Sequence, residues 1–382
     1  MRGRTLFGVI ISLYVLCVAA PELQITKGDA DSGVCLHKPP MSRLTIKDVA
    51  KMVGVSPSAV SLAINGRPGI SEATRKMILD CVEQTGFVPS QNSRSLVMKR
   101  TRSIALLWGT GCQPLEHLFF SDITRCLLNC CMEANYSLVF VSCDFRHSPV
   151  VLPEIIRSHG VDGVVCFGLV PGSVSYSINQ SELPLLILDS HTIVENAYCL
   201  CVDYFQAARL ATEHLISLGH TDIAYIGGTL AQPGFSHQTF EGYRSTMQEH
   251  GLEAPFSWIQ TCASELDDES AEEQMRLILN SGRSPTAVFC AADVYAIGAI
   301  RGIRRAGLRV PEDISVTGID DIVFSRYIDP PLTTVSIDDK RLAEMGCKLL
   351  FDAIEKGEHG GTVVDYNKLS LVTRASCCEL KK

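Results

Sequence analysis

The sequence predicts an all-α helix-turn-helix domain followed by a larger α/β region of two lobes, each a doubly wound parallel sheet. Three observations predict this. Over 43–89, apolar residues recur at intervals of three and four, the spacing of short amphipathic helices. From residue 103 onward, short apolar runs alternate with helix-like stretches, as in parallel sheets covered by helices. With 382 residues, 46% hydrophobic and 20% charged, the chain can form two or three domains with full cores.

The chain opens with a signal-like leader, residues 1–40. A basic MRGRT precedes an unbroken apolar run over 6–20, which is shorter than the roughly 20 residues that a membrane span needs. The leader therefore indicates secretion and not membrane insertion. The leader supports an exported protein. The next sixty residues indicate a different class of protein, so export is kept as the alternative.

Two short helices are expected directly after the leader. Thr45, followed three positions later by Asp48, is a shortened capping box, so a helix should run over 46–53 until a glycine ends it. A serine caps a second helix over 57–64, whose first residue is a proline and has no amide hydrogen to leave unpaired. Apolar residues repeat at three and four positions on both helices, so each should bury one stripe.

A third helix completes the motif. Ser71 should cap it, and it should end before Gly86. Two short helices joined by a three-residue turn that contains glycine, with a third helix behind them, are a helix-turn-helix. The outer face of the second helix is short and hydroxylated at Ser58 and Ser61, which suits close approach to DNA. An ordinary three-helix bundle without a ligand is the alternative that the helix pattern alone leaves open.

The charge distribution is uneven along the chain. Residues 41–102 hold ten Lys/Arg against four Asp/Glu, a net +6, whereas residues 103–382 hold twenty against thirty-five, a net −15. Clustered positive charge on a small domain favours binding to a polyanion, because each Lys or Arg that neutralises a phosphate releases a condensed counterion. A solvated helix face produces such an excess as well, so charge alone does not establish nucleic-acid binding.

These residues closely resemble the DNA-binding module of the LacI/GalR repressors. The matching stretches are TIKDVAKMVGVSPSAVSLAINGRPGISEATRKMI and GFVPSQNSRSL, and the likeness continues in LATEHLISLGHTDIAYIGG, FEGYRSTMQEHGL, SPTAVFCAADVYAIGAIRGIRRAGLRVPEDISVTGIDDI and PPLTTV. The resemblance covers about residues 43–376. Because family members begin near Met41, we expect a start codon assigned too far upstream and a chain that lacks the leader.

The resemblance implies a set of DNA-contacting residues, which are Thr45, Ile46, Ser56, Pro57, Ser58, Ser61, Leu62, Asn65, Ser71, Thr74, Arg94 and Leu96. Within this set, the second helix faces base edges, and the small hydroxyls elsewhere touch phosphates and fix the register. At the base-reading positions relatives often carry a large polar residue and then an arginine, where this chain has Pro57 and Leu62. Leucine cannot make the two-pronged contact to guanine, worth about 1 to 3 kcal/mol of discrimination. We therefore predict thymine methyl contacts at Leu62 and readout of groove shape.

Residues 90–102 form the hinge and linker. This segment is too short for a core of its own, so alone it should be disordered. The resemblance implies that two copies fold into hinge helices over the operator centre, with Leu96 wedged into the minor groove and Arg94 near the phosphates. The alternative is a linker that merely anchors on the following domain.

Residues 103–376 resemble the effector-binding and dimerisation domain of that family, which has the two lobes of a periplasmic binding protein. Crossovers between the lobes are expected near 202 and 333. Ligands of parallel sheets sit at the carboxyl ends of the strands, so the site should lie between the lobes. The expected effector contacts are Phe120, Asp189, Thr239, Asp293 and Asp320.

The expected effector site departs from the family in one important position. Relatives usually have an arginine that grips the ligand three residues before Gly242, and this chain has Thr239. Ile337 also stands where many relatives carry a polar side chain. The ligand is then less polar than a standard sugar, is held by Gln238 or His237 instead, or does not exist. Strand-end aspartates also serve as helix caps, so each retains that second interpretation.

The sixteen cysteines do not predict a metal site or an enzyme. The sequence has no Cys-x-x-Cys and no His-x-x-x-His pair, and the cluster Cys126, Cys130 and Cys131 suits small buried residues as well as ligands. Cys166 and Cys290 fall in strand-like runs, where burial suppresses thiol reactivity. We expect free thiols in a reducing compartment, with no cofactor, no metal and no catalysis.

Together these patterns predict a cytoplasmic, homodimeric, sequence-specific transcriptional regulator, of the repressor type, that binds a near-palindromic double-stranded DNA operator. A small-molecule effector, for which a sugar is one candidate, should bind between the lobes. No membrane association is expected. An exported periplasmic solute-binding protein of the same two-lobed fold is the alternative.

Overall fold

The structure is a computed structural model that describes residues 44–64, 66–87, 100–109, 118–146, 150–168, 170–189, 193–230, 234–263, 266–358, 361–366 and 368–380. The chain divides into two compact units, Met1–Val88 and Pro89–Lys382. The leader and most of the hinge segment, with Arg94 and Leu96, lie outside the described residues, as does Asn65.

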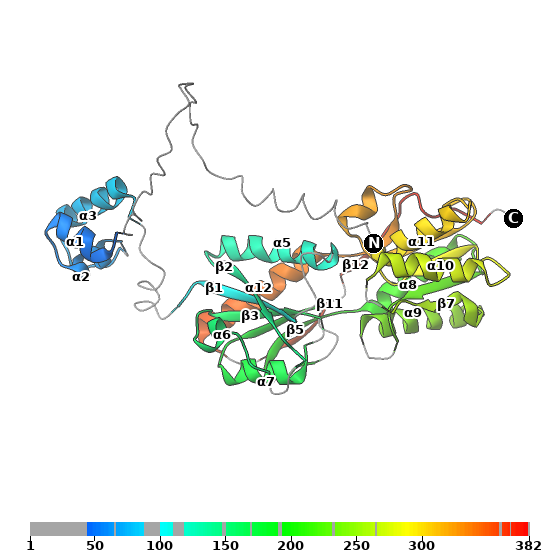
Figure 1. Ribbon diagram of the computed structural model, residues 1–382, viewed down its shortest axis with the longest axis horizontal. Helices are drawn as coiled ribbons and strands as arrows, with labels where there is room; N and C mark the ends of the chain where they lie inside the picture. Colours follow the sequence, from blue (N-terminus) through cyan, green and yellow to red (C-terminus); the bar gives the residue numbers. More distant parts are fainter. Residues whose placement is uncertain are drawn as a thin grey trace, which may run out of the picture. The chain divides into compact units, whose positions relative to one another are not determined.

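The first unit holds three described helices, drawn in blue in Figure 1: α1 (Ile46–Val53), α2 (Pro57–Ile64) and α3 (Glu72–Thr85). Their bounds are those that the capping signals predicted. The Thr45–Asp48 capping box starts α1, and Gly54 ends it in the left-handed region at φ 73°.

The core of this unit is small, and the three helices share it. Its buried members are Val49, Ala50, Val60, Ala63, Ile78 and Phe87. Ser71 caps α3 by accepting a hydrogen bond of 3.1 Å from the Thr74 amide. Because so few residues are buried, each hydrogen bond between the helices matters for the stability of this unit.

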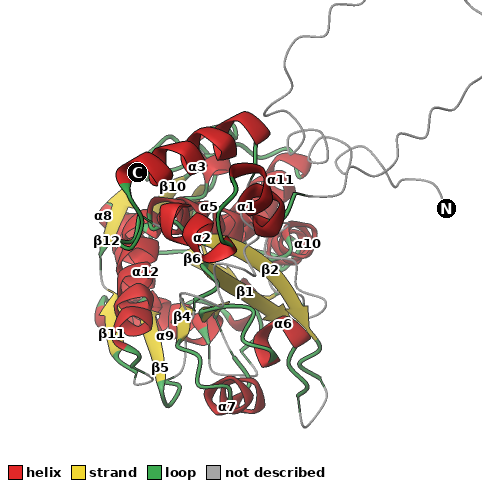
Figure 2. Cartoon of the chain, turned by 90° about the vertical axis from the view of Figure 1, so that its left-hand side faces the viewer, coloured by secondary structure: helices red, strands yellow, loops and turns green. Residues whose placement is uncertain are grey.

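The second unit begins with an amino-terminal lobe whose sheet is entirely parallel. Its strand order is β11-β5-β4-β3-β1-β2. The strands are β1 (Ser103–Gly109), β2 (Ser137–Cys143), β3 (Gly163–Phe167), β4 (Leu185–Leu188), β5 (Ala197–Val202) and β11 (Val363–Tyr366). The helices of this lobe are α5 (Leu118–Glu133), α6 (Glu154–Arg157), α7 (Gly172–Gln180) and α12 (Asp339–Lys356). Helices cover both faces of the sheet, as Figures 1 and 2 show.

The carboxyl-terminal lobe repeats this plan with the order β12-β10-β9-β8-β6-β7. The strands are β6 (Ile223–Gly227), β7 (Ile259–Thr261), β8 (Ala287–Cys290), β9 (Ser315–Asp320), β10 (Thr333–Ile337) and β12 (Leu369–Val372). The helices are α8 (Tyr204–Ser217), α9 (Phe235–Glu249), α10 (Asp268–Leu279) and α11 (Asp293–Arg305), with short 3-10 turns η2 (Phe256–Trp258) and η3 (Val323–Arg326). The edge strand β12 pairs antiparallel with β10, whereas the other pairs are parallel.

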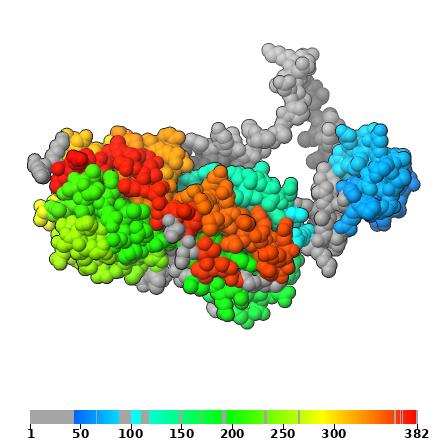
Figure 3. Space-filling view, turned by 180° about the vertical axis from the view of Figure 1, so that it is seen from behind, coloured from blue at the N-terminus to red at the C-terminus, as the bar shows by residue number. Residues whose placement is uncertain are grey.

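The chain passes between the two sheets three times within the described residues: after Val202, after Ile337 and after Tyr366. Sequence reasoning expected crossings near 202 and 333 and did not foresee β11 or β12. The second crossing follows β10 instead of preceding it, because β10 pairs with β9 in the carboxyl-terminal lobe. As a result, segments late in the sequence lie on both lobes, which the orange and red surfaces of Figure 3 display.

Strand β1 illustrates why the sequence of these sheets reads as continuous apolar runs. Ile104 and Leu106 pack into the large core that includes α5 and α12, while Ala105 and Leu107 pack into a second core on the opposite face. A parallel strand with helices on both sides has no solvent-facing positions, so it shows no alternation of apolar and polar residues. Among the described residues, no helix combines the length and the apolar character that crossing a bilayer requires.

Candidate nucleic-acid interface and inter-lobe site

Helix α2 presents a short polar face to solvent. Ser56, Pro57 and Ser58 are exposed at its start, and Ser61 and Leu62 are half-buried one turn later. The opposite face carries Val60 and Ala63, which are buried in the core of the unit. The side chain of Leu62 lies against Gly69, so only part of it faces outward. The face expected to read bases is therefore the face that the fold leaves accessible.

Both ends of α2 are fixed by hydrogen bonds. The Ser56 hydroxyl accepts a bond of 3.2 Å from the Ala59 amide at the start. At the other end the Arg75 guanidinium of α3 donates to the carbonyl oxygens of Leu62 at 3.3 Å, Ala63 at 3.3 Å and Arg67 at 2.6 Å. The Leu62 and Ala63 carbonyls also accept backbone amides, of Arg67 at 2.9 Å and of Gly66 at 3.2 Å, so the guanidinium adds a second donor to each. Sequence reasoning missed Arg75, because nothing local to α3 indicates where its side chain reaches.

The other hydroxyls expected to touch DNA lie at helix starts. The Thr45 hydroxyl donates to Asp48 Oδ2 at 2.7 Å, and the Thr45 amide donates to the same oxygen. These two hydrogen bonds lower the pKa of Asp48. The Ser71 and Thr74 hydroxyls lie 2.8 Å apart at the start of α3. Helix starts carry partial positive charge, which favours phosphate oxygens nearby. Ile46 is half-buried at the start of α1.

A hydrogen bond joins the two lobes of the second unit. Asp189 follows β4 at the carboxyl edge of the amino-terminal sheet, and its Oδ1 accepts a bond of 2.8 Å from the hydroxyl of Tyr204. Tyr204 is the first residue of α8, which packs on the carboxyl-terminal sheet. Both side chains are buried. Sequence reasoning proposed Asp189 and missed Tyr204, which looked like the end of a strand.

Carboxylates from both lobes gather at this point, and we call Asp189, Asp320 and Asp339 the inter-lobe carboxylate cluster. Burial is the largest cause that raises the pKa of Asp320 well above its usual range. The negative charges of Asp293, Asp339 and Asp189 raise it further. The pKa of Asp339 is raised to about 8, mainly by burial and further by the negative charges of Asp122 and Asp189. Each charge disfavours the others because little water screens them.

The backbone at these strand ends is unusual. Asp189 has φ 55°, Asp320 has φ 116° and Asp321 has φ 56°. Positive φ is uncommon outside glycine, although aspartate tolerates it better than most residues. Such conformations concentrate at binding and catalytic sites, where the surrounding fold enforces them. Two of these three residues are ones that the sequence analysis selected.

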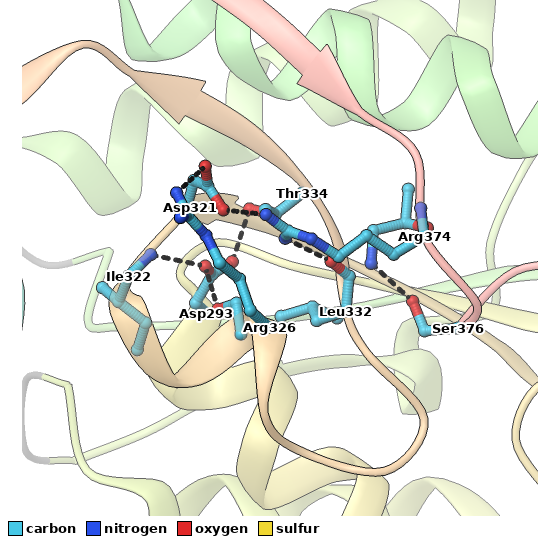
Figure 4. A network of polar contacts seen from close by, with 10 residues as sticks. Asp293, Asp321, Ile322, Arg326, Leu332, Thr334, Arg374 and Ser376 are labelled. Carbon is cyan, nitrogen blue, oxygen red and sulfur yellow. Dashed lines mark hydrogen bonds and ion pairs between the residues drawn. The ribbon is translucent and has the colours of Figure 1, made fainter.

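Asp293 lies in the interior of the carboxyl-terminal lobe. Its side chain has no exposed surface: Oδ2 accepts bonds from the Ile322 amide at 3.1 Å and the Ser325 hydroxyl at 2.5 Å, and Oδ1 accepts one from the Thr334 hydroxyl at 2.5 Å. Figure 4 shows these bonds converging from separate segments. Burial raises the pKa of Asp293 to about 7, although the hydrogen bonds oppose that shift. Asp293 thus joins α11 to the strand ends of its lobe, and its expected contact with an effector stays a prediction.

An ion-pair system stands beside Asp293 in Figure 4. Asp321 pairs with Arg374, and Arg326 lies 3.5 Å from its other oxygen. Arg374 also donates to the Leu332 carbonyl at 2.7 Å. The arginines therefore compensate Asp321, whereas Asp320 is surrounded by other carboxylates.

Thr239 also lies in the interior of this lobe. It is wholly buried in α9, and its hydroxyl donates to the Ser236 carbonyl at 3.0 Å and lies 3.2 Å from the Tyr225 hydroxyl. The expected contact of Thr239 with an effector stays a prediction. Of the two substitutes, His237 is exposed and Gln238 is half-buried. Ile337 is buried in β10.

Aromatic rings mark the amino-terminal side of the inter-lobe region. The ring of Phe120 in α5 stacks on that of Phe167 at the end of β3, with centroids 5.1 Å apart and planes inclined by 13°. The neighbouring Phe119 is buried. Phe167 was not predicted, since a strand-end phenylalanine looks like any core residue.

The interior thiols are not catalytic candidates. Burial raises the pKa of Cys166 to about 12 and that of Cys290 well above its usual value. Among the described residues, no group of three or more His, Cys, Asp or Glu side chains is arranged to hold a metal ion.

An exposed recognition helix in a basic helix-turn-helix unit, followed by two ligand-binding-type lobes, defines a DNA-binding transcriptional regulator. Comparison with family models agrees. Residues 45–90 match the bacterial regulatory proteins of the lacI family, and residues 212–377 match a periplasmic binding protein-like domain.

Curated relatives extend over most of the chain. The HTH-type transcriptional repressor PurR of Histophilus somni is 34% identical over 331 residues, which span 85% of this chain and 97% of the relative. The Bacillus subtilis protein named "Probable HTH-type transcriptional repressor ExuR" is 34% identical over 320 residues, 82% of this chain and 93% of the relative. The chain belongs to the lacI family of bacterial regulatory proteins. This membership favours the regulator over the exported binding protein.

Solved structures share the fold. The lac repressor dimer bound to operator and an anti-inducer has a TM-score of 0.73 at 24% identity, covering 88% of this chain and all (100%) of that chain. The regulator CelR in complex with cellobiose has a TM-score of 0.61 at 25% identity, covering 87% of this chain and 100% of that one.

Proposed function

We propose that this regulator acts in the cytoplasm as a homodimeric repressor, and that a small molecule bound between its lobes controls its hold on a near-palindromic operator. The observation that carries the DNA half of the proposal is the accessible α2 face, held at both ends by Ser56 and Arg75. A small helix inserted in the major groove must keep its orientation, and these bonds supply that.

The contacts with DNA divide into two kinds. Ser58, Ser61 and Leu62 would face base edges, with Ile46 and Pro57 beside them, while Thr45, Ser56, Ser71 and Thr74 would lie against phosphates. Asn65, Arg94 and Leu96, outside the described residues, complete the proposed set. Because Leu62 offers no donor, the readout at its position would rest on apolar contact with a thymine methyl and on groove shape.

An exposed apolar face supports the homodimer. Leu128 and Met132 on α5 and Phe140 on the edge strand β2 are 40%, 64% and 41% exposed, which is high for large apolar side chains. They belong to one lobe and to two elements that pack together. A second copy of the chain would cover this face, and two copies would present two α2 helices to a near-palindromic site.

The proposed effector lies among Asp189, Asp320 and the Phe120–Phe167 stack. Carboxylates accept hydrogen bonds from hydroxyl groups, and an aromatic face packs against the apolar face of a sugar ring, so a polyhydroxylated compound fits best. The Tyr204–Asp189 hydrogen bond connects the lobes, so a ligand that competes for Asp189 would shift the balance between lobe arrangements. Such a shift would alter how the two DNA-binding units meet the operator.

Selection of bound DNA from a random pool with the full-length chain tests the DNA-binding proposal. We expect an enriched near-palindrome without an invariant guanine opposite position 62. Leu62→Arg should then favour guanine there, by about 5- to 150-fold, the equivalent of 1 to 3 kcal/mol. Leu79→Ala is a suitable control, because Leu79 is an exposed leucine on α3. Failure to enrich any sequence over competitor DNA at moderate ionic strength would contradict the proposal.

A further inference from the structure

The last residues of the hinge segment are bound to the amino-terminal lobe at the end of α12. The Arg100 guanidinium donates to the carbonyl oxygens of Ile354 at 3.0 Å and Glu355 at 3.3 Å. The backbone amide of Glu358 donates to the Ala353 carbonyl at 3.0 Å, one residue earlier in the helix. A guanidinium suits this place because the last carbonyls of a helix carry partial negative charge. Arg100 therefore fixes the point where the hinge segment joins the lobe.

Asp162 holds the two residues that follow. Its Oδ1 accepts bonds from the Thr101 amide at 2.7 Å and the Thr101 hydroxyl at 2.8 Å, and its Oδ2 accepts one of 2.9 Å from the Arg102 amide. The amide of Asp162 donates to the Ser103 carbonyl of β1 at 2.8 Å. Hydrogen bonds to a charged group are roughly twice as strong as neutral ones. We call Arg100 and Asp162, which hold three consecutive residues, the hinge clamp.

A stack of side chains joins the hinge clamp to α5 and α12. The Arg102 guanidinium lies 5.1 Å from the ring centroid of Tyr136, three residues after the end of α5. The Tyr136 ring stacks in turn on Phe351 of α12, with centroids 5.0 Å apart and planes inclined by 16°. A Cβ on Gly163, at the start of β3, would lie 3.2 Å from Ile354 Cδ1. The ends of both helices therefore meet the hinge clamp at the amino edge of the sheet.

The same two helices begin at the inter-lobe site. On α5, Phe120 stacks on Phe167 at the carboxyl end of β3. Helix α12 starts at Asp339 of the inter-lobe carboxylate cluster, and the Asp338 carbonyl accepts a bond of 2.9 Å from the Tyr366 hydroxyl at the end of β11. With 18 residues, α12 spans roughly 27 Å. The two helices pack together, as Figure 1 shows, so each connects the proposed effector site to the hinge clamp.

Helix α12 also rests directly on the sheet. A Cβ on Gly346, near its middle, would lie 2.6 Å from the Leu188 side chain and 3.1 Å from that of Leu186 in β4. Such close packing resists sliding or tilting of the helix, because an interior at this density has no room for it. The sheet, α12 and the hinge clamp should therefore move as one body when the lobes change their arrangement.

We propose that Arg100 and Asp162 are positioning residues that make operator binding sensitive to the arrangement of the lobes. Control by the lobes belongs to the proposed function, on which this inference rests, and the inference assigns the contacts that carry the control. When the amino-terminal lobe turns, the hinge clamp turns the start of the hinge segment with it. A hinge segment released from the clamp would still reach DNA, but its direction would no longer follow the lobe.

A direct contact between Arg100 and a phosphate is the competing explanation for an effect of Arg100 on DNA binding. The two explanations make opposite predictions for Asp162. A carboxylate repels phosphate, so its loss would strengthen binding if charge alone mattered. Loss of the clamp instead predicts that removing Arg100 or Asp162, although they carry opposite charges, uncouples operator binding from the lobes.

A double-mutant cycle on operator affinity tests the proposal. The full-length chain is titrated with operator DNA recovered by selection from a random pool. Tyr204→Phe removes the hydrogen bond between Tyr204 and Asp189 and so perturbs the lobe arrangement without an added ligand. We expect this change to alter the operator Kd about fivefold or more in the otherwise unaltered chain. In Arg100→Met or Asp162→Asn it should alter the Kd by less than about twofold.

Two matched variants control for charge. Lys356→Met removes a positive charge from the last turn of α12, where Lys356 is exposed and lies 3.9 Å from Glu358. Glu154→Gln removes a negative charge from an exposed position of the same lobe. Both variants leave the hinge clamp intact. Tyr204→Phe should therefore keep its full effect on the operator Kd in both.

Three results would overturn the inference. Tyr204→Phe could have the same effect with and without the hinge clamp, it could have no effect in the unaltered chain, or Lys356→Met could abolish its effect as Arg100→Met does. Asp162→Asn keeps the side-chain volume and places an NH2 donor against the Arg102 amide, so it decides the question if Arg100→Met does not fold. An unaltered chain that binds no DNA sequence would instead contradict the proposed function, and the inference with it.

Discussion

The guanidinium of Arg75 is the most specific structural support of the proposed recognition helix. Its side chain is 17% exposed, and it donates to the carbonyl oxygens of Leu62, Ala63 and Arg67. Replacing it with methionine keeps the apolar stem and removes every donor. The Leu62 and Ala63 carbonyls then keep only their backbone donors, the amides of Arg67 and Gly66, and the Arg67 carbonyl loses the guanidinium.

The size of the effect follows from the distances. The contact to Arg67 at 2.6 Å is a full charge-assisted hydrogen bond, and the two at 3.3 Å are long and weak. A hydrogen bond that involves a charged group contributes roughly 1.5 to 3 kcal/mol, so we expect a loss of about 2 to 3 kcal/mol. This corresponds to a roughly 30- to 150-fold change in an opening equilibrium. The 3.5 Å pair with the exposed Glu72 adds little.

Hydrogen exchange followed by mass spectrometry measures this loss in the full-length chain. Amides of residues 57–67 in Arg75→Met should exchange about 30- to 150-fold faster than in the unaltered protein, because local opening becomes more frequent. Strand β9 in the second unit provides an internal control and should not change. Arg75→Lys should be nearly as damaging, since one ammonium group cannot span three carbonyls.

Glu72→Ala is the control for the ion pair and should change protection by no more than about twofold. If Arg75→Met leaves the protection of 57–67 within about threefold of the unaltered protein, the hydrogen bonds do not hold α2. The account of its fixed orientation would then be incorrect.

Two further predictions concern the lobes. Burial and nearby carboxylates raise the pKa of Asp339 to about 8, so its contribution to stability is complete below its ordinary pKa of about 4 and is lost as pH rises through 8. Asp339→Asn should therefore show a smaller fall in Tm between pH 6 and 9 than the unaltered protein, and parallel curves would contradict this. At the α8–α9 crossing, a Cβ on Gly242 would meet the Phe205 carbonyl and lie 2.9 Å from Ala208 Cβ. Gly242→Ala should lower the free energy of unfolding, measured with urea, by about 1 to 3 kcal/mol. Gly172→Ala should have little effect, because a Cβ there would have no atom within 4 Å. Equal effects of the two substitutions would refute the packing argument.

The amino-acid sequence determined the helices of the first unit to the residue. Their starts and ends depend on interactions within about four positions, such as the Thr45–Asp48 box, the Ser71 cap and the left-handed Gly54. Strand β1 was equally predictable, because its first five residues are all buried and leave a clear apolar run. The accessible face of α2 followed from the same helical periodicity.

Only the tertiary structure decided the rest. Strands β11 and β12 are four residues long, too short for a periodic signal, and their partners β5 and β10 are distant in sequence or joined through a crossing. Thr239 and Asp293 are wholly buried, and this burial depends on which helices close over them. The reach of Arg75 to α2 and the bond between Tyr204 and Asp189 both join separate elements. Contacts of this kind depend on where folding brings the elements together, and no local pattern of residues encodes that.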